Sequence, residues 1–254
     1  MEENREYPTE ENQNESEAQY PVLGKLSFDI FTRFLDGSVQ LKPKEKQKYI
    51  QRYFDKIFFP DTNARKDAYL IMRLLMPQID RERGTYGLKE ANLGKIIGES
   101  LGLSKVDANR LYHFKNPQFH PKDAAYIGDF VLVMKSVVGP FCSPNSKLTL
   151  LEVDTFLDKL ANCQEKSKAL EFTQILRVCS AKDLEWICRI ILKDLKIGIT
   201  HEKILPMYNP ASGDLFNRTY NLRKVCEDGV IIQATLDTPT SLTVVLYISS
   251  FSSR

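Results

Sequence analysis

The chain has 254 residues, of which 43% are hydrophobic and 27% charged, and its net charge at pH 7 is +2. These values are typical of a soluble globular protein with one large or two small domains. They argue against a membrane-spanning protein, because the longest apolar run, Leu242–Ile248, is far too short to cross a bilayer.

The charge is unevenly distributed along the chain. Residues 1–20 carry seven glutamates and one arginine, whereas the remainder carries 34 basic and 26 acidic residues. We expect residues 1–22 to form a disordered acidic tail. The basic remainder suits a polyanionic partner.

Two helices are predicted after this tail. The first begins at Leu23 and ends at Gly37, and the second spans Lys44–Phe58. Together they hold more aromatic side chains than two short helices need for mutual packing. The surplus indicates either core packing or a groove that docks a partner peptide. The phenylalanines of this candidate groove are Phe31, Phe34, Phe54 and Phe58.

The most apolar predicted helix spans Ala68–Asp80 and should end or kink at Pro77. A charged turn with two glycines, Arg81–Gly87, separates it from a helix over Leu88–Leu103. Three glycines spaced four residues apart in this second helix each cost about 1 kcal/mol relative to alanine. We therefore expect a neighbouring helix backbone to approach them closely. These glycines are Gly94, Gly98 and Gly102.

The rest of the chain up to residue 227 reads as helices separated by polar or proline-containing loops. Strand signals are nearly absent before residue 228, so the predicted fold class is all-α, with about ten or more helices and no repeat period. The remaining predicted helices include Ser104–Arg110, Phe130–Val138, Leu150–Leu160, Ser167–Cys179, Glu202–Tyr208 and Ala211–Cys226.

A predicted helix around residue 190 combines an apolar face with a row of cations. Arg189, Lys193 and Lys196 are spaced i, i+4 and i+7, so a continuous helix would align them as a basic stripe. Gly198 is expected to end this helix, and Thr200 to cap the next one, whose free N–H groups attract phosphate. The segment indicates either a nucleic-acid backbone site or a solvated lysine face.

The five cysteines are scattered without a C-x-x-C pair, and the three histidines show no metal-ligand spacing. This pattern predicts free thiols in a reducing compartment, with neither a disulfide framework nor a metal site. No signal peptide is expected, since the first residues are acidic and lack an apolar segment.

Several stretches resemble the N-terminal DNA-binding domain of eukaryotic ATP-dependent DNA ligases, and DNA ligase IV most of all. The specific combination is RLLMPQIDRERGTYG, within Ala68–Leu103, with RIILKDLKIG, within Trp186–Cys226. Gly128–Met134 and Leu148–Ala161 also match, and the resemblance covers roughly residues 23–227. It implies an all-helical domain that grips duplex DNA around a nick or break, mostly through the backbone along the minor groove.

The resemblance also implies site residues. Its lysine–glycine segment, which contacts DNA in the family, coincides with the basic stripe of this sequence. The implied DNA-binding residues are Arg189, Lys193, Lys196, Gly198 and Thr200, with Lys89, Arg223 and Lys224 as weaker candidates. In DNA ligase IV the early helices dock the nuclease Artemis, which would place that partner on the four phenylalanines named above.

The catalytic motif of the family is missing. Ligases form a lysine–AMP intermediate at a K-x-D-G motif, and this sequence contains none. We assign no catalytic residue and expect the chain alone to be inactive and to bind no cofactor, although ATP and Mg²⁺ are implied for a full-length ligase. The adenylation domain, the oligonucleotide-binding domain and the C-terminal region that binds the scaffold partner of ligase IV are also absent.

After about residue 228 the sequence departs from the family pattern. Residues 229–254 are β-prone and serine-rich. The runs VIIQATL and LTVVLYI form either a hairpin or part of an unstructured tail from a truncated or alternatively spliced product.

The sequence therefore predicts a nuclear DNA-binding domain of a ligase IV-like protein that acts in non-homologous end joining. Its expected organisation is an acidic tail at 1–22, a helical domain at 23–228 and a divergent tail at 229–254. The alternative is a helical platform that docks partner peptides and binds no DNA. A third reading, an active ligase, predicts adenylation on mixing with ATP.

Overall fold

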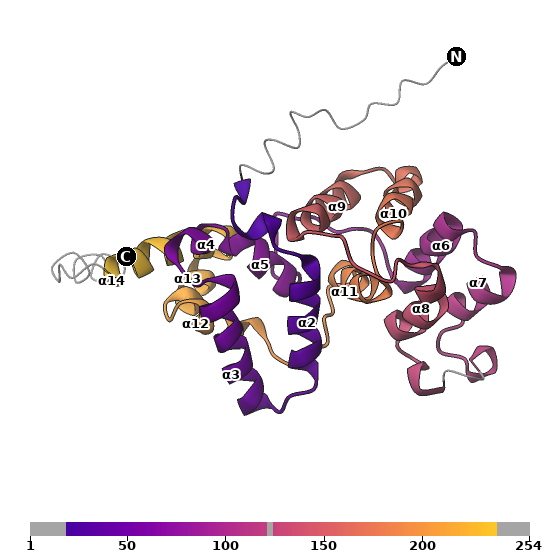
Figure 1. Cartoon of the computed structure of the whole chain (residues 1–254), viewed down its shortest axis with the longest axis horizontal. Coiled ribbons are helices and arrows are strands. Elements are labelled where there is room, and N and C mark those ends of the chain that lie inside the picture. The colour runs from indigo at the N-terminus through magenta and orange to yellow at the C-terminus, as the bar shows by residue number, and fades with distance from the viewer. Residues whose placement is uncertain (1–18, 121–123, 238–254) are drawn as a thin grey trace, which may run out of the picture.

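The computed structural model describes residues 19–120 and 124–237, and the regular elements of these residues are helices (Figure 1). The predicted all-α fold class is thus confirmed. The described α-helices are α2 (Phe28–Val39), α3 (Pro43–Tyr53), α4 (Thr62–Lys66), α5 (Ala68–Leu75), α6 (Glu90–Leu101), α7 (Lys105–Tyr112), α8 (Phe130–Val138), α9 (Leu150–Asn162), α10 (Lys168–Leu176), α11 (Ala181–Ile191), α12 (His201–Tyr208), α13 (Ser212–Thr219) and α14 (Leu222–Asp237).

Helix α11 lies in the middle of the molecule, where it packs against α8 on one side and α2 on the other (Figure 1). All of its residues from Asp183 to Ile191 are buried. A capping box at Ser180 and Asp183 fixes its first turn. The Trp186 indole Nε1 donates a hydrogen bond to Asp36 Oδ1 of α2 at 2.8 Å. The first turn and the middle of this central helix are therefore fixed in position.

The aromatic side chains of α2, α3 and the short π-helix η2 (Phe54–Phe58) form a continuous cluster inside the protein. Phe31, Phe34, Phe54 and Phe58 are each at most 1% exposed. The rings of Phe34 and Phe58 meet edge to face with centroids 5.2 Å apart. The expectation that these four side chains form a docking groove is wrong, because their rings pack against one another in the core and are not exposed to a partner.

Two expectations about glycines also need correction. Helix α2 continues through Gly37 to Val39 instead of ending there, and the ring of Tyr49 occupies the place where a Cβ would sit. In α6 only Gly94 is closely approached, by the Phe130 ring at 3.1 Å from an ideal Cβ and not by a helix backbone. Gly98 has open surroundings, and Gly102 caps the C-terminus of the helix with φ of +60°.

A buried charge network fixes the connection between α5 and α6. Arg73 Nε donates to Asp80 at 3.0 Å and its Nη1 donates to Asp154 of α9 at 3.1 Å. Arg83 donates to Asp154 at 2.6 Å and to Asp158 at 2.8 Å. Helix α5 ends at Leu75, just before the proline predicted to stop it. The network holds the connection that leads into α6.

The last described helix, α14, runs to Asp237 and packs against α4, α5 and α13. The hairpin and the unstructured-tail readings are therefore both wrong for VIIQATL, which is helical, and the expected boundary at residue 228 falls inside this helix. The second run, LTVVLYI, and residues 1–18 of the acidic tail lie outside the described residues. No helix in the described ranges has the length and hydrophobicity needed to cross a bilayer.

Candidate nucleic-acid interface

Helix α11 ends two turns earlier than the spacing of its cations predicted. Leu192 is its C-cap, and Lys193 follows in the left-handed region with φ of 55°. The Lys193 N–H donates to the Ile190 carbonyl and the Asp194 N–H to the Arg189 carbonyl, both at 3.0 Å. This is a Schellman motif with lysine in the position usually taken by glycine. The prediction of a continuous helical stripe is therefore wrong, because the helix ends and the chain turns at Lys193.

Lys196 also adopts a left-handed backbone, with φ of 52°. Its side chain is 50% exposed, and its ammonium lies 2.9 Å from Asp129 Oδ2. Left-handed residues other than glycine cost about 1–2 kcal/mol each. Such outliers cluster at binding and catalytic sites, so two of them within four residues mark this segment as a candidate site.

Asp129 joins this segment to α8. Its Oδ1 accepts hydrogen bonds from the N–H groups of Val131 and Leu132 at 3.0 and 3.3 Å and so caps the helix. Burial alone raises the pKa of this carboxyl, but the hydrogen bond from Lys196 and the charge of Arg189 outweigh burial and hold the pKa below its ordinary value. Asp129 is therefore a charged anchor that holds both cations in place.

Arg189 is not the exposed cation that the predicted stripe requires. It is 6% exposed, lies over the Trp186 ring, and places its guanidinium 3.4 Å from Asp129 and 3.7 Å from Glu185. Glu185 also accepts a hydrogen bond from Lys135 at 2.7 Å. Arg189 thus forms a buried part of the site, where it orients Asp129 and adds a positive charge close to the cleft.

A cleft of about 400 Å³ opens where α6 begins, α8 begins and α11 ends. Four cations line it from three separate stretches of the chain: Lys89, Lys115, Arg189 and Lys196. Three carboxylates also line it: Glu90, Asp129 and Asp194. Lys89 is the N-cap of α6 and makes no side-chain capping bond, so the first N–H groups of this helix have no cap from it. Converging cations and a helix start are features that bind phosphate.

The other residues expected to bind DNA lie outside the lining of the cleft. Gly198 is exposed with φ of +68°, and Thr200 is exposed at the N-cap position of α12, where its side chain caps no backbone group. Lys193 is half-buried beside the turn. Arg223 is committed elsewhere: its guanidinium lies 2.7 Å from Glu82 and stacks over the Tyr69 ring.

Sequence reasoning missed Lys115 and Asp129. Lys115 lies in the polar loop after α7, whose path no periodicity reveals. Asp129 had a local signal, because an aspartate immediately before an apolar helix is a typical N-cap. No local sequence signal indicates that Asp129 pairs with Lys196, which lies 67 residues further along the chain. The described residues contain no group of three or more His, Cys, Asp or Glu side chains that could hold a metal ion.

Comparison with known proteins identifies the family. Residues 27–209 match the family model described as "DNA ligase N terminus". The chain is 36% identical over 174 residues to DNA ligase 4 of Arabidopsis thaliana, 33% over 195 residues to that of Gallus gallus and 33% over 182 residues to that of Homo sapiens. These alignments cover 66%, 72% and 69% of this chain.

The same alignments cover only 14%, 21% and 20% of the three relatives, so the matched part spans about a fifth of their length at most. The matched stretch includes the connection from α5 to α6, helix α8, and α11 with the segment that follows it. It therefore contains every side chain that lines the cleft. The chain belongs to the DNA ligase N-terminus family.

Proposed function

We propose that this chain binds duplex DNA at nicks or breaks through its sugar–phosphate backbone, and that the cleft between α6, α8 and α11 is the main contact. The observation that carries the proposal is the convergence of Lys89, Lys115, Arg189 and Lys196 on one cleft. Lysine and arginine supply most phosphate contacts in DNA-binding proteins, and such contacts do not depend on base sequence. DNA binding without sequence preference suits a protein that acts on broken ends of any sequence.

The proposal also concerns the compartment and the repair process in which the chain binds DNA. By likeness to the DNA ligase 4 relatives, the chain acts in the nucleus, in double-strand-break repair by end joining. It contributes DNA binding and not ligation chemistry, since its sequence contains no K-x-D-G motif. ATP and Mg²⁺ belong to the proposal only for a full-length ligase.

The rival function, a platform that docks partner peptides, loses its main support. It depended on Phe31, Phe34, Phe54 and Phe58 as an exposed aromatic groove, and these side chains are buried. They give no support to docking of the nuclease Artemis either.

The test is a band-shift titration of nicked duplex across a salt series. The triple variant Lys89→Gln/Lys115→Gln/Lys196→Gln removes three exposed cations without placing a carboxylate beside Asp129. We expect its Kd to rise about tenfold or more at low salt. The slope of log K against log salt should fall in magnitude by about 2.7, since each neutralised phosphate contributes about 0.9.

The matched control is Lys25→Gln/Lys159→Gln/Lys166→Gln, which removes three exposed cations near α9 that do not line the cleft. This control should bind almost as tightly as the parent chain. Equal affinity of the cleft variant and the control, with unchanged helical circular dichroism, would refute the proposed site. Absence of duplex binding by the parent chain at low salt would refute the proposed function.

A further inference from the structure

The outer face of α3 and η2 carries a second set of cations that the cleft does not use. Lys44, Lys48, Arg52 and Lys56 recur every four residues, and all four are exposed. A helix rises about 1.5 Å per residue, so this row extends over roughly 18 Å. Among the described residues no carboxylate forms an ion pair with any of the four. Their charge is therefore available to an external anion.

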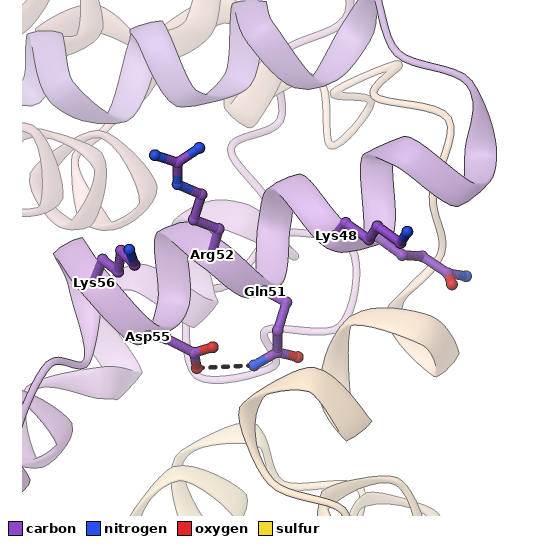
Figure 2. Close-up of a pocket in the computed structure, with 6 residues that line it drawn as sticks. Lys48, Gln51, Arg52, Asp55 and Lys56 are labelled. Carbon is purple, nitrogen blue, oxygen red and sulfur yellow. Dashed lines mark hydrogen bonds between the residues drawn. The ribbon is translucent and has the colours of Figure 1, made fainter.

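A shallow groove runs beside this row (Figure 2). Its two walls are neighbouring i+4 ridges of a single helical stretch. One wall consists of Lys48, Arg52 and Lys56, and the other of Gln47, Gln51 and Asp55. The groove has a volume of about 470 Å³.

The second wall is held by hydrogen bonds. Gln51 Nε2 donates to Asp55 Oδ1 at 2.9 Å (Figure 2). It also donates to the Met207 carbonyl of α12 at 3.2 Å. Asp55 is therefore engaged by an amide on its own ridge and pairs with none of the three cations.

The composition of the groove favours a sugar–phosphate backbone over a partner protein. All six lining side chains are polar, whereas the centre of a protein–protein interface is depleted in charged residues, lysine and aspartate included. Lysine, arginine and glutamine are among the side chains that contact DNA phosphates. We infer that this groove is a second contact for the backbone of duplex DNA, outside the stretch held by the cleft. The inference rests on the proposed function.

A hydrogen bond links helix α3 to the segment that carries Lys196. Lys46 projects from the inner side of α3, and its ammonium donates a hydrogen bond to the carbonyl of Ile197, the residue after Lys196. Helix α3 also packs against α12, which begins directly after this segment. The row on α3 and the segment with Lys196 are therefore held by elements that contact each other directly.

The experiment compares nicked duplexes of about 12 and about 40 base pairs, since each base pair adds about 3.4 Å. The variant is Lys48→Gln/Arg52→Gln/Lys56→Gln in the whole chain. We expect a Kd about tenfold or more higher on the long duplex, with a salt slope lower in magnitude by about 2.7. On the short duplex, which the cleft occupies, its Kd should change less than threefold. The Lys25, Lys159 and Lys166 control should change neither.

Three results for the groove variant would overturn the inference. Parent-like affinity of the groove variant on the long duplex would overturn the inference, as would an equal loss on both lengths. Retained DNA binding combined with lost capture of an acidic helical peptide would assign the groove to a protein partner instead, and would also overturn it. Failure of the proposed function looks different, because the parent chain would then bind neither duplex at low salt.

Discussion

The ammonium of Lys196 and the carboxylate of Asp129 lie 2.9 Å apart, although 67 residues separate them in the sequence. The same carboxylate caps α8 and faces Arg189 at 3.4 Å. One acidic side chain thus ends a helix and holds two cations at the cleft. It also occupies Lys196, so an incoming phosphate must compete with it.

Replacing Asp129 with asparagine should tighten DNA binding. Asparagine keeps an oxygen that can cap α8, but it removes one negative charge from a cleft lined by four cations and three carboxylates. A single charge at contact distance in water is worth about 1 kcal/mol, which corresponds to about fivefold in affinity. We expect Kd for nicked duplex to fall by about that factor at low salt, measured by fluorescence anisotropy.

The control for this prediction is Asp29→Asn, which removes a first-turn carboxylate of α2 that does not line the cleft. Its Kd should stay within about twofold of the parent value, because screening weakens distant charges. Weaker binding by Asp129→Asn would instead indicate that the carboxylate mainly orients the cations for the phosphate.

The stability contributed by Asp129 should depend on pH. Its pKa is lower in the folded chain than the value of about 3.9 expected in the unfolded chain. The folded state therefore favours the charged carboxylate, and this contribution is fully present above about pH 4 and disappears as pH falls through the lowered pKa. Urea unfolding should show the parent chain more stable than Asp129→Asn at pH 7, with the gap closing towards pH 2. A gap independent of pH would contradict this assignment.

The buried network around Arg73 makes a stronger prediction for stability. Arg73→Met would leave Asp80 and Asp154 buried without this partner, and removing one member of a buried pair costs about 3–5 kcal/mol. We expect urea unfolding to show a loss in that range. The same substitution at the exposed pair Arg33–Asp29 should cost no more than about 1 kcal/mol. Similar losses at the two sites would mean that the network contributes little.

The sequence was sufficient for the fold class and for most helices, because apolar periodicity and strong stop signals agree there. Helix α5 ends just before Pro77, and α8 ends at Val138, just before Gly139, as local signals predicted. Helix α2 continues through Gly37, where the missing side chain leaves room for Tyr49 from the next helix. Tertiary packing of this kind leaves no mark on local sequence.

The candidate site was only half accessible to sequence reasoning. Lys89 and Lys196 were named from spacing and resemblance, and the fold brings them to one cleft. The end of α11 was misplaced because Lys193 adopts a backbone conformation that normally signals glycine. Lys115 and Asp129 were missed because their roles arise from long-range contact.

The left-handed turn at Lys193 yields a prediction that separates backbone strain from charge. Glycine adopts this conformation without the penalty of about 1–2 kcal/mol that a side chain meets, although it costs more entropy on folding. We expect Lys193→Gly to raise the free energy of unfolding by up to about 1 kcal/mol. The same change at exposed Lys203 within α12 should lower it by about 1 kcal/mol, because glycine disfavours helix. Destabilisation at both positions would contradict the assigned turn.

Gly37 provides the converse case, a glycine that is required for space and not for backbone freedom. An alanine Cβ would lie 2.7 Å from Cζ of Tyr49, with the hydroxyl closer still, and Tyr49 stacks on Phe34 at 2° between ring planes. Alanine gains about 1 kcal/mol in helix propensity, but overpacking costs about 1–3 kcal/mol, so we expect Gly37→Ala to destabilise the chain by about 1 kcal/mol. Gly84→Ala, which meets no atom within 4 Å, should be neutral or slightly stabilising. In a Tyr49→Leu background the penalty at residue 37 should shrink, and an unchanged penalty in that double-mutant cycle would exclude the steric explanation.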